Sequence, residues 1–162
     1  MSEARAIAAT GMLGSGFSED SLYRGLDWDP HFIGADSGST DLGPSHLGSG
    51  STFFSKEAVK RDLRLMIKAG REKGIPVLVG TAGGAGGDLQ LQWLRQITEE
   101  IASESGHRFR AAFIHSEQNK DFLKAQLKRG KIKPLKPAPS LDDGVIDRSM
   151  HIVAMMGPEP FT

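Results

Sequence analysis

The spacing of apolar residues along the chain predicts strands and helices in alternation. Between Ser55 and Gly74, the residues Val59, Leu63 and Met66 fall on one stripe of a helix, and basic residues cover much of the remainder. Short apolar runs bounded by glycine, proline or acidic residues predict strands at residues 4–10, 32–35, 77–79, 109–115 and 151–156. Helices are expected between them, at residues 18–27, 55–74, 88–105 and 117–129.

This alternation predicts an α/β fold. We expect one domain over residues 1–162 with three layers: a mostly parallel sheet flanked by helices in a Rossmann-like arrangement, either complete or part of a larger domain. Right-handed crossovers place the C-terminal ends of parallel strands along one edge, where such sheets bind ligands. The turns expected there are rich in glycine and acidic residues: 11–16, 36–41, 80–87, 115–117 and 156–159. A functional site is therefore expected at this edge.

The most glycine-rich of these turns follows the apolar run at 77–79. Small residues fill positions 80–87, and Asp88 then stands where the N-cap of the next helix is expected. Glycines allow main-chain N–H groups to converge in front of the positive end of a helix dipole, which suits a phosphate or a carboxylate. A tight turn without a ligand is the alternative. The spacing matches neither a P-loop, which needs a lysine, nor a dinucleotide fingerprint, because Leu89 replaces the third glycine.

Three turns thus supply the residues expected to contact an anionic ligand. They are Gly14, Ser15 and Gly16 in the first turn, Ser37, Gly38, Ser39 and Thr40 in the second, and Thr81, Gly83, Gly84, Gly86 and Gly87 in the third.

The same edge carries the candidate catalytic residues Asp36, Asp41 and Glu117. Paired carboxylates can divide the general-acid and general-base roles when their surroundings separate their pKa values. They can also hold a hard divalent cation through oxygen ligands, or simply accept backbone N–H bonds within the turn. All three interpretations stay open, and no metal ligand is assigned. His46 and His115 lie nearby, but a lone histidine is more often a neutral, hydrogen-bonded group.

The composition of the chain bears on which partners the protein can bind and in which compartment it is expected. The 20 basic residues balance the 20 acidic ones, so no basic field favours nucleic acid or an anionic membrane. The chain has no cysteine, which excludes disulfides, a thiol nucleophile and thiolate metal ligands. It shows no basic leader and no apolar run long enough to span a bilayer. We expect a soluble, cytoplasmic protein.

Several stretches resemble the N-terminal part of the acyclic terpene utilisation (AtuA-like) protein family. They are residues 14–18, the Phe-Ile-Gly-Ala-Asp-Ser-Gly-Ser-Thr-Asp stretch at 32–41, residues 47–50 and 54–63, the glycine-rich turn at 80–88, residues 115–118, and residues 152–160 with their Met-Met-Gly-x-Glu-Pro ending. The resemblance implies a cytoplasmic bacterial catabolic protein associated with branched or terpenoid acids as CoA thioesters. Because members of that family continue well beyond the Met-Met-Gly-x-Glu-Pro segment, it also implies a truncated or split form.

From these features we expect an enzyme of lyase, hydratase or isomerase type that acts on a small carboxylate or a CoA thioester. The turn at 80–87 would hold the anionic group, Asp36, Asp41 or Glu117 would move a proton, and the loop at 36–54 would close over the substrate. A surface loop without function is the alternative for residues 36–54. The alternative functions are a non-catalytic module that binds phosphate or acyl-CoA, and an incomplete domain that needs a partner chain or a second copy.

Overall fold

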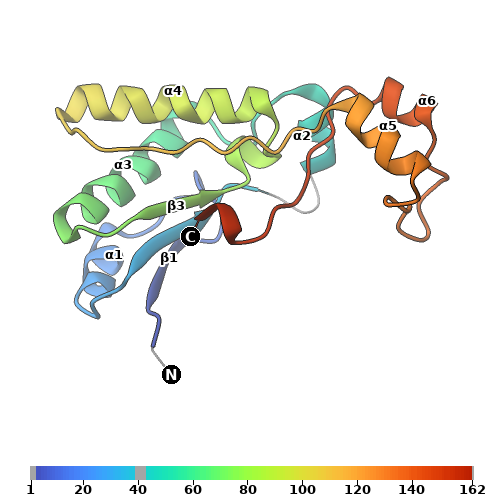
Figure 1. Ribbon diagram of the computed structural model, residues 1–162. Helices are drawn as coiled ribbons and strands as arrows, with labels where there is room; N and C mark the ends of the chain where they lie inside the picture. The colour runs from blue at the N-terminus through green and yellow to red at the C-terminus, as the bar shows by residue number, and fades with distance from the viewer. Residues whose placement is uncertain (1–2, 39–42, 162) are drawn as a thin grey trace.

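A small parallel sheet organises the chain, of which the computed structural model describes residues 3–38 and 43–161. The strands β1 (Ala6–Thr10), β2 (Phe32–Asp36) and β3 (Val77–Gly80) lie in the order β1-β2-β3 (Figure 1). Both pairs are parallel, with Ile33 of β2 in register with Ile7 of β1 and Val77 of β3. The predicted α/β class with a parallel sheet is therefore confirmed.

One face of this sheet is covered by helices. The helices α1 (Glu19–Leu26) and α3 (Lys56–Lys73) connect successive strands, and α4 (Asp88–Ser105) lies beside α3 (Figure 1). Because the strand order follows the chain order, right-handed crossovers place α1 and α3 on the same face. Ile33, Met66, Ile97 and Ile101 are among the fully buried side chains between these elements. The described residues thus form a sheet and one helical layer.

Local sequence signals set the ends of the long helices. The hydroxyl of Ser55 accepts the N–H of Ala58 at 3.2 Å at the start of α3, and Gly74 ends that helix in the left-handed conformation. At α4 the expectation was one residue off, because Gly87 is the N-cap and Asp88 is the first helical residue. A carboxylate in the first turn still interacts favourably with the helix dipole.

The long stretch before α3 contains a helix that we did not predict, α2 (Gly43–Ser49). The buried side chain of Gln90 on α4 holds it in place. The amide nitrogen of Gln90 donates to the carbonyl oxygens of His46 at 3.0 Å and Ser51 at 3.1 Å. This part of the stretch is therefore fastened to the first turns of α4.

Two predicted strands were wrong. Residues 109–115 run extended alongside α4 without strand pairing, and residues 151–156 contribute a single antiparallel bridge between Val153 and Glu117 (Figure 1). Apolar alternation makes a segment suitable for a strand, but a strand forms only where a neighbouring backbone completes the hydrogen bonds. Residues 109–114 have no such neighbour in the part of the chain that is described.

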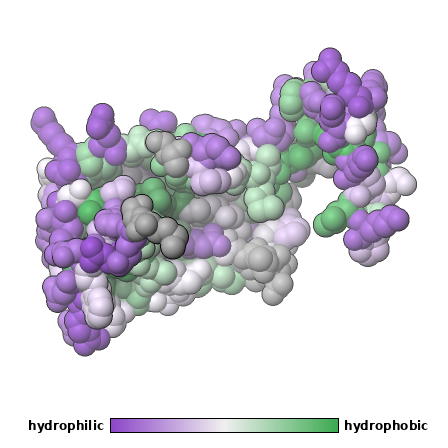
Figure 2. Space-filling view, turned by 60° about the horizontal axis from the view of Figure 1, so that its bottom comes forward, coloured by the Kyte–Doolittle hydropathy of each residue, from purple (hydrophilic) through white to green (hydrophobic). Residues whose placement is uncertain are grey.

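The C-terminal third ends in a separate helical lobe. The helices α5 (Lys120–Lys128) and α6 (Asp143–Arg148) pack on each other and project from the body of the molecule (Figure 2). One contact within the lobe involves the backbone carbonyl oxygen of Asp147, which accepts a hydrogen bond from Lys120 Nζ at 3.0 Å. Beyond it, η2 (Glu159–Phe161) is a short 3₁₀ turn. None of the described helices is both long and apolar enough to cross a membrane.

Candidate functional site

The turns that follow the three strands meet at one edge of the sheet. The N–H of Leu13, after β1, donates to the carbonyl oxygen of Asp36 at 2.7 Å, and the N–H of Ser37, after β2, donates to that of Gly80 at 2.9 Å. These two bonds join the first turn to the second and the second to the third. The sequence-based expectation that these turns share an edge therefore agrees with the geometry.

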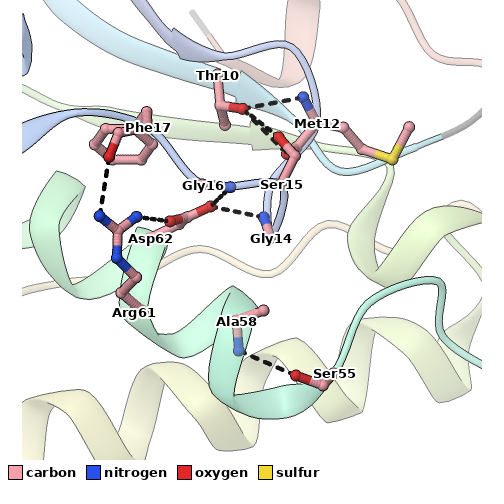
Figure 3. Close-up of polar contacts among 10 residues, drawn as sticks. All are labelled: Thr10, Met12, Gly14, Ser15, Gly16, Phe17, Ser55, Ala58, Arg61 and Asp62. Atoms are coloured by element: carbon pink, nitrogen blue, oxygen red, sulfur yellow. Dashed lines mark hydrogen bonds and ion pairs between the residues drawn. The ribbon is translucent and has the colours of Figure 1, made fainter.

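The first turn holds an internal anion (Figure 3). Asp62 of α3 is fully buried, and its Oδ2 accepts the N–H groups of Gly14 and Gly16, both at 2.9 Å. Its other oxygen, Oδ1, lies 2.6 Å from Arg61 Nη1. The hydroxyl of Ser15 donates to Met12 O at 2.7 Å. Two N–H groups that we predicted for an external anion thus already bind a carboxylate of the protein itself.

In the second turn, too, a carboxylate of the protein accepts a main-chain N–H group. Asp36 Oδ1 accepts the N–H of Gly38 at 2.9 Å, which corresponds to the interpretation of this carboxylate as a turn cap. Ser37 is buried at 3% exposure. The other three predicted residues of this turn, Ser39, Thr40 and Asp41, lie outside the described residues.

The glycine-rich third turn is largely covered. It forms η1 (Ala82–Gly84), and the N–H groups of Gly84 and Gly86 donate to Thr81 O at 3.2 Å and Ala82 O at 3.0 Å. Gly83 has a positive φ of 62°, and a Cβ there would lie only 2.8 Å from that of Gln90. Glycine at this position therefore serves close packing against α4. Gly87 is also buried, and α2 packs against η1.

Beside the beginning of α4 lies a contact between a carboxylate and an imidazole, which we call the Glu117–His151 pair. Oε2 of Glu117 accepts the N–H of Asp88 at 3.0 Å, and Oε1 lies 2.6 Å from Nδ1 of His151. The two side chains are 21% and 18% exposed, so the pair is partly shielded and still reachable from solvent. A second and more exposed pair, His115 Nδ1 with Asp88 Oδ1 at 2.7 Å, lies next to it.

Backbone contacts fix this arrangement. Ser116 Oγ donates to the carbonyl oxygen of Gly86 at 2.8 Å, which ties the glycine-rich turn to the segment that carries Glu117. The N–H of Gln118 donates to Ile152 O at 2.8 Å, and the N–H of Ala154 donates to Ser116 O at 2.9 Å. These bonds place Val153 opposite Glu117 and bring the side chain of His151 into contact with that of Glu117, although 34 positions separate the two residues in the sequence.

The structure therefore sorts the predicted site residues into two groups. Asp36 lies with the second turn and Glu117 with the start of α4, and no hydrogen bond in the described chain joins them. We missed His151, because no local motif marks it. The only signal was its position at the head of the apolar run 151–156. In the described ranges, no three histidine or acidic side chains are grouped so that they could hold a metal ion.

Comparisons with protein-family models, with curated proteins and with solved structures found no match to this chain. The resemblance to the acyclic terpene utilisation family accordingly stays a prediction, and the site has to be interpreted from its own geometry.

Proposed function

We propose that the protein is an enzyme that moves a proton on a small carboxylate or a CoA thioester, through lyase, hydratase or isomerase chemistry. In this proposal His151 is the proton-transferring group and Glu117 is the residue that orients it. The observation that carries the proposal is the 2.6 Å contact between His151 Nδ1 and Glu117 Oε1.

A carboxylate on one imidazole nitrogen determines what the other nitrogen can do. When His151 is neutral, its Nδ1–H donates to Glu117, so Nε2 carries the lone pair that can accept a proton. After it accepts that proton, the imidazolium is stabilised by the adjacent carboxylate. Among the described residues Nε2 has no hydrogen-bond partner, so it is available to a substrate.

Glu117 is itself held in place by the beginning of α4. Its second oxygen accepts the N–H of Asp88, at the end of the helix where the dipole favours negative charge. Because this carboxylate is fixed, it restricts the rotation of the imidazole. General-base catalysis benefits from such a fixed orientation of the base. Asp36 is less suitable for this role, because its hydrogen-bond partner is the N–H of Gly38 and no hydrogen bond joins it to a histidine among the described residues.

The substrate class rests on the sequence resemblance and not on the geometry. The C–H bond next to the carbonyl group is more acidic in a CoA thioester than in a free carboxylate, and a positioned histidine is a suitable base for removing that proton. The helix α2 packs against η1 and would cover part of the glycine-rich third turn when a substrate is bound.

Isotope exchange tests the proposal without knowledge of the full reaction. The chain would be incubated in D2O with isobutyryl-CoA, isovaleryl-CoA and the corresponding free acids, and deuterium at the carbon next to the carbonyl would be measured by mass spectrometry. We expect exchange with at least one of these compounds. The variants His151→Asn and Glu117→Gln should slow it by roughly 10²- to 10⁴-fold.

Glu57→Gln is the matched control, because it also converts an acid to an amide but lies exposed in the first turn of α3. It should exchange at the unmodified rate. If a CoA compound raises the melting temperature but no deuterium enters, the protein is a binding module and the enzymatic proposal is wrong. Exchange that persists undiminished in His151→Asn would remove His151 from the mechanism.

A further inference from the structure

A large cavity lies between the outer edge of β3 and the extended segment 109–114, with α3 and α4 along one side. Its volume is about 1020 Å³, and its walls include Val77 and Val79 of β3, Leu63 of α3, and Leu94 of α4. Figure 1 shows β3 and the segment after α4 running in the same direction. The cavity therefore has a strand edge on one side, an extended backbone on the other and apolar helix side chains beside both. Residues 153–156, 160 and 161 of the C-terminal segment form a further wall.

Both backbone walls carry hydrogen-bonding groups that have no partner among the described residues. β2 pairs with β3 through the carbonyl oxygens of Pro76 and Gly80, which accept the N–H groups of Ile33 and Ser37 at 3.0 and 2.9 Å. Because backbone groups alternate sides along a strand, those of Val77 and Val79 point to the cavity. Across it, residues 109–114 make no backbone hydrogen bond to any described residue. Unpaired edges of this kind are templates for a further strand.

The size of the cavity fits one strand. Ordinary sheet spacings are about 3.3 Å per residue, about 4.8 Å between strands and about 10 Å between layers, so a five-residue strand occupies roughly 800 Å³. The cavity of about 1020 Å³ accommodates this volume. An apolar small molecule could fill the space, but it would leave the N–H and C=O groups on both walls unpaired.

The protein's own C-terminal segment does not complete the sheet. It forms one antiparallel bridge, in which Ala154 donates to Ser116 O. Continuing the same register would place Pro158 and Pro160 opposite residues 112 and 110, at positions that must donate an N–H to the ladder. Proline has no N–H, so the ladder cannot continue there.

Two arginines that line the cavity indicate the charge of a molecule that would occupy it. Arg71, in the last turn of α3, and Arg110, at the start of the extended segment, both line the cavity, and no carboxylate of the described residues does. Neither guanidinium has a hydrogen-bond or ion-pair partner in the described chain. Both lie towards the end where β3 begins. An occupant with an acidic residue at that end would complement them.

We propose that a β-strand of a partner polypeptide inserts between β3 and residues 109–114, parallel to both. Its alternate apolar side chains face α3 and α4, and an acidic residue at its N-terminal end pairs with Arg71 and Arg110. The inserted strand joins the three-stranded sheet to the extended segment, so that the predicted strand at 109–115 becomes a strand only in the complex. This proposal is independent of the enzymatic one.

Designed peptides test the insertion on the full chain. The probes are blocked, fluorescein-labelled hexapeptides of the pattern Glu-Val-Thr-Val-Thr-Val, with Val, Ile or Phe at the alternate apolar positions, and binding is followed by fluorescence anisotropy. We expect saturable binding of at least one probe. Methylation of two backbone nitrogens should weaken it by roughly ten-fold or more, because several backbone hydrogen bonds are lost while the side chains stay the same.

A charge reversal tests the register. Arg110→Glu should bind a probe that begins with Lys better than one that begins with Glu, which reverses the preference of the unmodified chain by roughly ten-fold. Arg108→Glu is the matched control, since Arg108 is an exposed arginine two residues earlier that does not line the cavity. It should keep the original preference. These arginines are not part of the Glu117–His151 pair, so deuterium exchange should not change with Arg110→Glu.

Four outcomes would overturn the proposal. They are equal binding of the N-methylated probes, absence of saturable binding by all probes, a stable dimer in which a second copy excludes them, and stabilisation by palmitate without peptide binding. The last outcome would identify the cavity as a site for a long-chain carboxylate.

Discussion

Asp62 and Glu117 are two carboxylates that serve main-chain N–H groups in different ways. Asp62 is fully buried, accepts the N–H groups of Gly14 and Gly16 through one oxygen and contacts Arg61 through the other. Glu117 remains partly exposed, and its second oxygen contacts the imidazole of His151. In the first turn, the carboxylate that accepts the glycine N–H groups belongs to the protein itself. Glu117 differs from Asp62 because its partner, His151, is a titratable side chain that solvent can reach.

The largest effect on stability is expected at Asp62. Asp62→Ala would leave two inward-facing N–H groups and the Arg61 guanidinium without their shared partner. Because each N–H left without a partner costs about 1–3 kcal/mol, we expect a loss of roughly 2–6 kcal/mol in the free energy of unfolding, which for a chain of this size lowers the Tm by about 10 °C. Urea denaturation and thermal unfolding measure both quantities.

Glu57→Ala is the control for this prediction, because Glu57 is an exposed acid in the first turn of the same helix. It should change the Tm far less than Asp62→Ala. Equal losses in the two variants would mean that the turn at 14–16 does not depend on the buried carboxylate.

A smaller effect on stability is expected at Glu117. Glu117→Ala removes the acceptor for the Asp88 N–H at the start of α4, and loss of such a cap costs about 1 kcal/mol. The same change removes the group that orients His151, so its effect on proton exchange should be much larger than its effect on Tm. A Tm loss as large as that of Asp62→Ala would erase the distinction between the two carboxylates.

The smallest effect on stability is expected from loss of the ion pairs that surface carboxylates form between α3 and α4. Hydrogen bonds from Lys56 and Lys60 hold the pKa of Glu100 below its usual value, and Lys60 does the same for the pKa of Glu104. Because these pKa values are lowered on folding, their contribution is present above the ordinary glutamate pKa and is lost as the pH falls through the lowered values. Exposed pairs of this kind contribute little.

Lys60→Met tests this contribution through the dependence of Tm on pH. The difference in Tm between the variant and the unmodified chain should be present at pH 7 and should shrink as the pH falls below 4. Lys60 also has a raised pKa, through its hydrogen bonds to Glu100 and Glu104, so the difference should shrink again at strongly alkaline pH. A pH-independent difference would show that the side-chain stem of Lys60 matters more than its charge.

Much of the fold could be predicted because its signals are local. The helix from Lys56 to Lys73 is specified by its apolar stripe, its Ser55 cap and its Gly74 stop, and all three lie where expected. The parallel strands β1 to β3 were also predicted, and so was the common edge of their turns. What could not be predicted is which acceptor each turn uses. Asp62 lies 48 positions from Gly14, in a helix whose pattern marks it only as a polar residue.

The sequence by itself determined the elements, their alternation and the accumulation of glycine and acidic residues at one edge, because each depends on neighbours within a few positions. Tertiary structure decided that Glu117 contacts His151, that Asp62 binds the N–H groups of the first turn, and that residues 109–114 pair with no strand among the described residues. Those outcomes depend on contacts between segments far apart in the chain, where no local spacing records which group will lie opposite which.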